Sequence, residues 1–109
     1  MKNAKLHTLT ALALCVCGCL TVGAAHANET LAKKYGCTGC HAVAEKIVGP
    51  AFVEIGKRYG AENDAQATIA QSIQKGGVGK WGKIPMPPNE NVTGVDAKVL
   101  AEWILATPK

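Results

Sequence analysis

Apolar residues recur at helical spacing in four stretches of the chain, separated by polar or glycine-rich segments. In the first stretch, Leu31 and Tyr35 lie four residues apart, as neighbours on one helix face do. Asn28 precedes them and suits an N-cap position, so we expect this helix to begin at Asn28 and to run toward Gly36. Residues 42–49 are then predicted to form a connecting loop.

Residues typical of helix ends delimit two further helices. Pro50 favours a helix start and Gly60 a stop, which predicts a short second helix between them. Asp64 is a good N-cap for a third helix, which Gly76 and Gly77 should end. The apolar residues on the inner faces of these two helices are Phe52, Ile55, Tyr59, Ile69 and Ile73.

The segment GGVGKWGKIPMPPN, residues 76–89, contains too many glycines and prolines for regular structure. A last helix is expected to start near Thr93, with Asp96 completing a capping-box variant, and to end by Pro108. Its predicted apolar face comprises Val95, Val99, Leu100, Trp103 and Ile104. No alternating strand pattern is present, so the sequence predicts an all-α domain with about four helices and one long, ordered loop.

The N-terminal segment has the three parts of a secretory signal peptide. Lys2 and Lys5 are basic, an apolar run extends from about Leu9 to Ala25, and Ala25-His26-Ala27 is a small-x-small cleavage pattern. We therefore predict that residues 1–27 are a signal peptide directing the protein to the periplasm.

The same segment has two alternative interpretations besides a cleaved signal. An uncleaved membrane anchor would need ~20 apolar residues, and this run is slightly short. Lipid attachment at Cys19 is a minor alternative, because Val16-Cys17-Gly18-Cys19 loosely resembles a lipobox. The A-x-A pattern is the cleaner signal, so we expect one domain, residues 28–109, without stable membrane insertion.

Cleavage after Ala27 would simplify the chemistry of the chain. It would remove three of the 5 cysteines, two of the 3 histidines and one of the 2 methionines, leaving Cys37, Cys40, His41 and Met86. It would also remove two of the 12 basic residues and none of the 8 acidic ones, and the mild positive charge left is too small and dispersed for nucleic-acid binding. A domain this short buries a thin core and often needs a cofactor, metal or disulfide.

The stretch GCTGCH, residues 36–41, carries the candidate chemistry. A zinc site needs at least three protein ligands, and apart from Cys37, Cys40 and His41 only carboxylates are available. A redox dithiol normally follows a strand, which is not predicted here, and a Cys37–Cys40 disulfide would constrain very little. C-x-x-C-H is the attachment sequence of haem c, in which two thiols one turn apart add to two vinyl groups. Haem c is the favoured hypothesis, and a non-haem thiol module is kept as an alternative.

GCTGCH, followed by Gly49-Pro50 and then by WGKIPMPPN at residues 81–89, resembles the short bacterial class I cytochromes c. These are small periplasmic electron carriers, and the resemblance covers residues 28–109. It implies a cytochrome c fold, with four to five short helices wrapped around one covalently bound haem c.

The resemblance also implies the ligands. Cys37 and Cys40 would form the thioether bonds, and His41 and Met86 would bind the iron from its two sides. Met86 could instead be a core filler, but it lies in a proline-rich loop rather than on a helix face.

Three further residues are expected near the haem by resemblance. The Pro50 carbonyl would accept a hydrogen bond from Nδ1 of His41, Trp81 would donate its indole N–H to a propionate, and Asn89 would donate to the Met86 sulfur. Each has a simpler alternative role: a helix-start proline, a packed aromatic ring and a loop-turn asparagine.

Two positions depart from the family pattern. Ser72 stands where relatives often carry an arginine that contacts a propionate, and Lys83 stands where they often have proline. Both substitutions change the charge expected near the haem. A patch around the exposed haem edge could include Lys33, Lys34, Lys46, Lys80 and Lys83.

Iron ligated by both His41 and Met86 would have no open position, which argues against an enzyme and for a one-electron carrier. The family suggests a monomer that docks weakly and transiently with redox proteins, and that delivers electrons from a quinol-oxidising complex to a terminal oxidase or a nitrite reductase. The alternative function is a gas sensor, or a cytochrome subunit of an enzyme, in which Met86 is labile.

Overall fold

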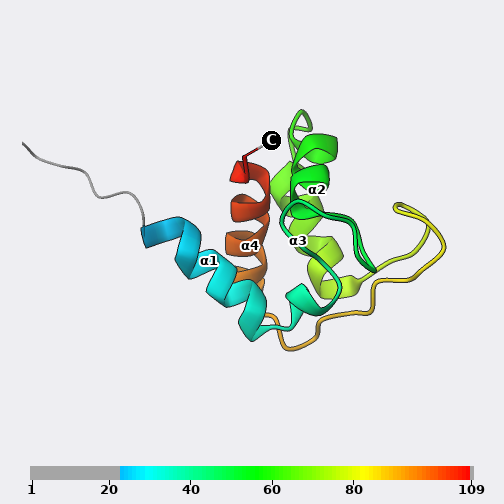
Figure 1. Cartoon of the computed structure of the whole chain (residues 1–109), viewed down its shortest axis with the longest axis horizontal. Helices are drawn as coiled ribbons and strands as arrows, with labels where there is room; N and C mark the ends of the chain where they lie inside the picture. Colours follow the sequence, from blue (N-terminus) through cyan, green and yellow to red (C-terminus); the bar gives the residue numbers. More distant parts are fainter. Residues whose placement is uncertain (1–22, 109) are drawn as a thin grey trace, which may run out of the picture.

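The computed structural model describes residues 23–108, and it is helical, as predicted (Figure 1). No strand is formed among these residues, and a single isolated bridge pairs Gly77 with Met86. The helical elements are α1 (Gly23–Lys34), the 3₁₀ turn η1 (Cys37–Gly39), α2 (Phe52–Tyr59), α3 (Ala65–Lys75) and α4 (Gly94–Ala106).

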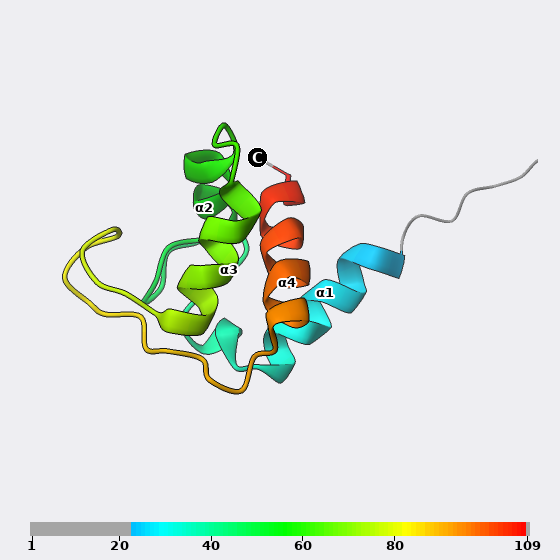
Figure 2. The ribbon, with the colours of Figure 1, turned by 180° about the vertical axis from the view of Figure 1, so that it is seen from behind.

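The C-terminal helix α4 is the centre of the fold and contacts α1, α2 and α3. Figures 1 and 2 show it beside α2 and α3, with α1 crossing near its start. Its buried stripe consists of Ala97, Leu100, Ala101 and Ile104. A Cβ atom at Gly56 of α2 would lie 2.7 Å from the Ile104 carbonyl oxygen, so only glycine allows α2 to approach this closely.

Most predicted helix ends are confirmed. The Thr93 hydroxyl accepts a hydrogen bond from the Asp96 backbone N–H at 3.1 Å, which is the predicted cap of α4. Gly60 and Gly76 end α2 and α3 as expected. Asp64 does occupy the N-cap position of α3, but its side chain makes no capping hydrogen bond.

Two expectations about helices are wrong. The first helix begins at Gly23 rather than at Asn28, because the alanine-rich residues before Asn28 are good helix formers and contain no stop signal. Val95 is 73% exposed instead of lying on the apolar face of α4. It is two residues from Ala97, which at about 100° per residue turns it to the opposite side of the helix.

The two long loops are tied to the helices. Residues 42–49 form the predicted loop, in which Ala42 and Val43 accept backbone hydrogen bonds from the start of α2 at 2.9 and 3.0 Å. Residues 77–92 contain no helix, and they run from the end of α3 around to α4 (Figure 1). The hydroxyl of Tyr35, just after α1, donates to Asp96 at the start of α4 at 2.5 Å.

The predicted signal peptide lies largely outside the described residues, which begin at Gly23. Within residues 23–108, no helix combines the length and apolar character that crossing a membrane requires.

Candidate functional site

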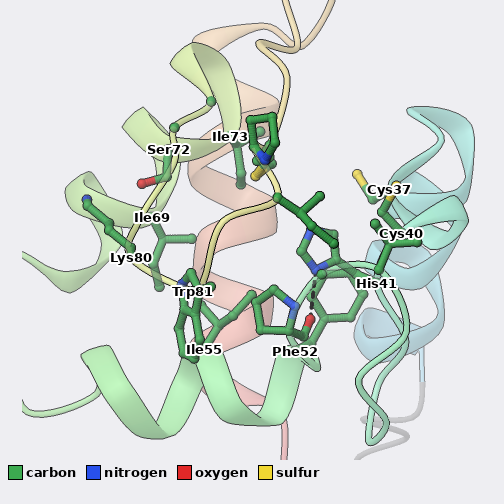
Figure 3. A pocket seen from close by; sticks show the side chains of 18 of the residues that line it. Cys37, Cys40, His41, Phe52, Ile55, Ile69, Ser72, Ile73, Lys80 and Trp81 are labelled. Atoms are coloured by element: carbon green, nitrogen blue, oxygen red, sulfur yellow. Dashed lines mark hydrogen bonds between the residues drawn. The ribbon is translucent and has the colours of Figure 1, made fainter.

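The helices and the two long loops enclose a cavity of about 260 Å³ (Figure 3). A water molecule needs about 10 to 15 Å³ by the same kind of measure, so there is room for a much larger group. Most of the lining side chains are apolar, and none is a carboxylate. The predicted site residues that line the cavity are Cys37, Cys40, His41, Pro50, Trp81 and Met86, together with the two departures, Ser72 and Lys83.

The turn η1 brings the two cysteines to one side of the cavity (Figure 3). Gly36 enters this turn at φ +73°, and the backbone N–H groups of Cys40 and His41 both donate to the Cys37 carbonyl, at 3.2 and 2.9 Å. Both thiols are free, and burial raises the pKa of the Cys37 thiol. A redox dithiol needs a lowered thiol pKa, so this environment does not favour that alternative.

His41 is buried, with 8% of its surface exposed. Its Nδ1 lies 2.7 Å from the Pro50 carbonyl oxygen, so the hydrogen bond expected from the resemblance is present. A carbonyl oxygen only accepts, so Nδ1 carries a proton, and in the neutral imidazole Nε2 then keeps a lone pair that can bind a metal. The ring stacks on Phe52 at 5.4 Å between centroids. A Cβ at Gly49 would be 2.5 Å from the ring, so glycine is needed there.

The backbone of Met86 is held in a two-way hydrogen-bonded pair with Gly77. The Gly77 N–H donates to the Met86 carbonyl at 3.0 Å, and the Met86 N–H donates to the Gly77 carbonyl at 2.8 Å. The chain enters this pair through Gly76 at φ +66° and ψ −161°, a region open essentially to glycine alone. A Cβ at Gly76 would collide with the Met86 carbonyl oxygen at 2.3 Å. Met86 is thereby anchored at the end of α3 and lines the cavity.

Asn89 has a different partner from the one expected. Its Nδ2 donates to the Ile73 carbonyl of α3 at 2.9 Å and lies 3.5 Å from the Pro87 carbonyl, and Asn89 does not line the cavity. It therefore ties the loop to α3. A bond from Asn89 to the Met86 sulfur stays a prediction.

Trp81 lines the cavity on the side opposite the cysteines (Figure 3). Its ring packs edge-on against Tyr59, with 6.4 Å between centroids, and the Arg58 guanidinium lies 4.5 Å from the Trp81 ring centre. Ser72 also lines the cavity, and its hydroxyl donates to the Thr68 carbonyl one turn earlier in α3 at 3.0 Å.

Three residues that shape the site were not predicted as site residues: Gly49, Gly76 and Arg58. Gly49 precedes Pro50 in the quoted motif, and Gly76 was assigned only as a helix end, so both carried a local signal. No local signal indicated Arg58, because the loop residues that it contacts are 22 and 23 positions away in the sequence.

The donor set fits a haem c rather than a bare metal ion. Two thiols on one turn, an imidazole nitrogen and a thioether meet in one apolar cavity. Among the described residues, no three His, Cys, Asp or Glu side chains are grouped so that they could hold a metal ion, which leaves the zinc alternative without support.

Comparison with known proteins agrees with this geometry. Residues 25–108 match the cytochrome c family. The chain belongs to this family. It therefore binds covalently attached haem c with its iron, and the protein is a small electron-carrier cytochrome that works with redox partner proteins.

The relatives of this cytochrome c are of similar size. Cytochrome c-552 of Nitrosomonas europaea is 49% identical over 105 residues, which are 96% of this chain and 97% of the relative. Cytochrome c-552 of Hydrogenobacter thermophilus is 50% identical over 84 residues, 77% of this chain and 85% of the relative. The crystal structure of the Nitrosomonas europaea cytochrome c552 superposes with a TM-score of 0.72, covering 73% of this chain and 99% of that one. The fold is therefore the predicted cytochrome c fold.

Proposed function

We propose that this cytochrome c shuttles single electrons in the periplasm, from a quinol-oxidising complex to a terminal oxidase or a nitrite reductase, and that it is not an enzyme. One observation carries the proposal: His41 and Met86, 45 positions apart in the sequence, line the same apolar cavity as the two cysteines.

Each side chain has a distinct task in this proposal. Cys37 and Cys40 hold the haem through two thioether bonds, and the bound haem supplies an iron couple that alternates between the ferric and ferrous states. His41 presents Nε2 to the iron in one orientation, because its Nδ1–H is held by Pro50. Met86 presents a soft thioether, which favours the ferrous state and raises the reduction potential.

The residues that line the cavity also favour a higher reduction potential. An apolar lining penalises the additional positive charge of the ferric form. Lys46, Lys80 and Lys83 also line the cavity, and no carboxylate in the lining offsets their positive charges. Both effects favour the ferrous state. If His41 and Met86 both bound the iron, they would leave no coordination site for a substrate, which supports a carrier rather than an enzyme.

The rim of the cavity suits weak docking with redox proteins. Val48, Val78 and Ile84 line the cavity and are exposed, and Val43 and Ile47 are exposed elsewhere on the loop before Pro50. Of the lysines considered for the docking patch, Lys46, Lys80 and Lys83 line the cavity. Lys33 instead pairs with Glu29 at 2.8 Å, and Lys34 lies over the Tyr35 ring. We expect a monomer that forms small, short-lived contacts with its partners.

The coverage of the relatives supports cleavage near Ala27. The match to the Nitrosomonas europaea relative extends over 96% of this chain, whereas the crystallised cytochrome c552 of the same organism covers 73% of it. The difference is about a quarter of the chain, close to the length of residues 1–27, and the family match itself begins at residue 25. The mature domain would then comprise residues 28–109, and Asn28 would become its first residue.

An optical spectrum of the protein isolated from the periplasm tests this function. We expect a c-type spectrum in both oxidation states, and no change when carbon monoxide is added to the reduced sample. Ready binding of carbon monoxide would reveal a labile Met86 and support the sensor or enzyme alternative. Absence of a haem spectrum, in cells that mature c-type cytochromes, would refute the haem assignment and leave a non-haem thiol module.

A further inference from the structure

Arg58 joins helix α2 to the tip of the loop that carries Trp81. Its guanidinium lies 4.5 Å from the centre of the Trp81 ring, and its Nη1 donates to the Lys80 carbonyl. It also lies 5.9 Å from the Tyr59 ring, which packs edge-on against Trp81 from the same helix. One side chain therefore contacts both the ring and the backbone of this tip.

The tip has few other attachments. Gly79 and Gly82 flank it at φ +93° and +117°, and the Gly79 N–H donates to the Gly82 carbonyl at 3.0 Å within the tip itself. Within the part of the chain that the structure describes, the bond from Arg58 is the one hydrogen bond that links residues 78–85 to a helix. Val78 and Ile84 are about two-thirds exposed, whereas Trp81 is 36% exposed. Trp81 is thus held in the wall by its ring contacts and by the bond from Arg58 to the neighbouring Lys80 carbonyl.

Arginine suits this position better than lysine. A planar guanidinium can cover an aromatic face while its N–H groups donate in the plane, but an ammonium is a compact charge that cannot do both as well. No ion pair of Arg58 with a carboxylate occurs within residues 23–108, so its charge is not neutralised by a neighbour.

We propose that Arg58 is a positioning residue: it holds Trp81 in the cavity wall and thereby sets the reduction potential of the haem. Trp81 and Lys80 line the side of the cavity opposite the cysteines (Figure 3). The effect of Arg58 on the reduction potential rests on the proposed function, whereas its role in fixing the position of Trp81 does not.

Three variants of the haem-loaded protein test the proposal. R58M removes the charge and the hydrogen bond, and R58K keeps the charge but loses the planar contact. K57M is the matched control, because Lys57 is the preceding residue of α2 and pairs with Glu54 at 2.8 Å instead of touching Trp81. Two readouts are taken on the reduced protein: the exchange rate of the Trp81 indole N–H, assigned with Trp81→Phe, and the reduction potential.

Loss of the ring contact and of one hydrogen bond should increase local opening, and so indole exchange, by about tenfold in R58M. R58K should also exchange faster and should shift the potential, although its charge is unchanged. K57M should resemble the wild type in both measurements.

An exchange rate in R58M equal to that of the wild type would overturn the proposal. So would R58K with the wild-type potential, because Arg58 would then act through its charge alone. The visible spectrum of the same samples decides the proposed function separately. A spectrum of the reduced wild type that changes when carbon monoxide is added would refute the carrier function, while the exchange rates would still show whether Arg58 holds Trp81.

Discussion

Gly76 offers the sharpest test of how the fold anchors Met86. Replacing it with alanine would force a residue with a side chain into φ +66° and ψ −161°, which costs about 1 to 3 kcal/mol. The new Cβ would also lie 2.3 Å from the Met86 carbonyl oxygen and 2.8 Å from backbone atoms of Pro87 and Pro88. Backbone atoms cannot turn away as a flexible side chain could, so the loop must move.

Movement of the loop by about 1 Å would break the hydrogen-bonded pair between Gly77 and Met86. Each of those two bonds contributes about 0.5 to 1.5 kcal/mol. Together with the backbone strain, we expect Gly76→Ala to lower the free energy of unfolding by about 2 to 6 kcal/mol, a large part of the 5 to 15 kcal/mol typical of a domain. For a domain of this size that corresponds to a melting temperature at least about 8 °C lower.

Gly77→Ala is the matched control for this variant. The φ of Gly77 is not positive, and a Cβ there would meet nothing within 4 Å, so the change should cost less than about 0.5 kcal/mol. The assays are denaturant unfolding and addition of carbon monoxide to the reduced protein. Gly76→Ala should unfold earlier and bind carbon monoxide, because Met86 is displaced from the iron. If the two variants have equal stability and both exclude carbon monoxide, the proposed anchoring of Met86 is refuted.

Three further variants test other contacts. Gly49→Ala places a Cβ 2.5 Å from the His41 ring and should displace the imidazole, which a shifted reduction potential and altered visible spectrum would report. Gly56→Ala overpacks α2 against α4 and should cost about 1 to 3 kcal/mol in denaturant unfolding. The hydrogen bond to Asp96 raises the pKa of Tyr35 above its ordinary value of 10.0, so its stabilisation is complete below pH 10 and is lost as the pH rises through the raised pKa. Tyr35→Phe should therefore lower the melting temperature at neutral pH and reduce its fall above pH 10.

Gly94→Ala is the control for both Gly49→Ala and Gly56→Ala. Gly94 has no positive φ, and a Cβ there would meet nothing within 4 Å, so Gly94→Ala should behave like the wild type. An unchanged potential in Gly49→Ala, or a Gly56→Ala protein as stable as Gly94→Ala, would contradict the respective contact. If the melting temperature of Tyr35→Phe falls above pH 10 as much as that of the wild type, the hydrogen bond to Asp96 is not the cause of that fall.

Local signals were enough to locate most of the elements and the donor atoms. Thr93 caps α4 as predicted, since a cap depends only on residues within one turn. The prediction that Asn28 begins the first helix failed because the preceding residues of the intact chain also favour a helix. The error at Val95 has another cause: the packing of the neighbouring helices selected one of the possible apolar stripes of α4.

The sequence by itself determined the chemistry of this protein, namely a pair of thiols one turn apart, a histidine that follows them and a methionine set among prolines. The two thiols and His41 lie within one short stretch, where spacing alone dictates geometry, and Met86 stands out 45 positions later by its neighbouring prolines. Only the tertiary structure decided that His41 and Met86 share a cavity, that Asn89 bonds to Ile73, and that Arg58 covers Trp81. Those contacts join residues 16 to 45 positions apart, and they depend on how α2, α3 and α4 pack rather than on any local pattern.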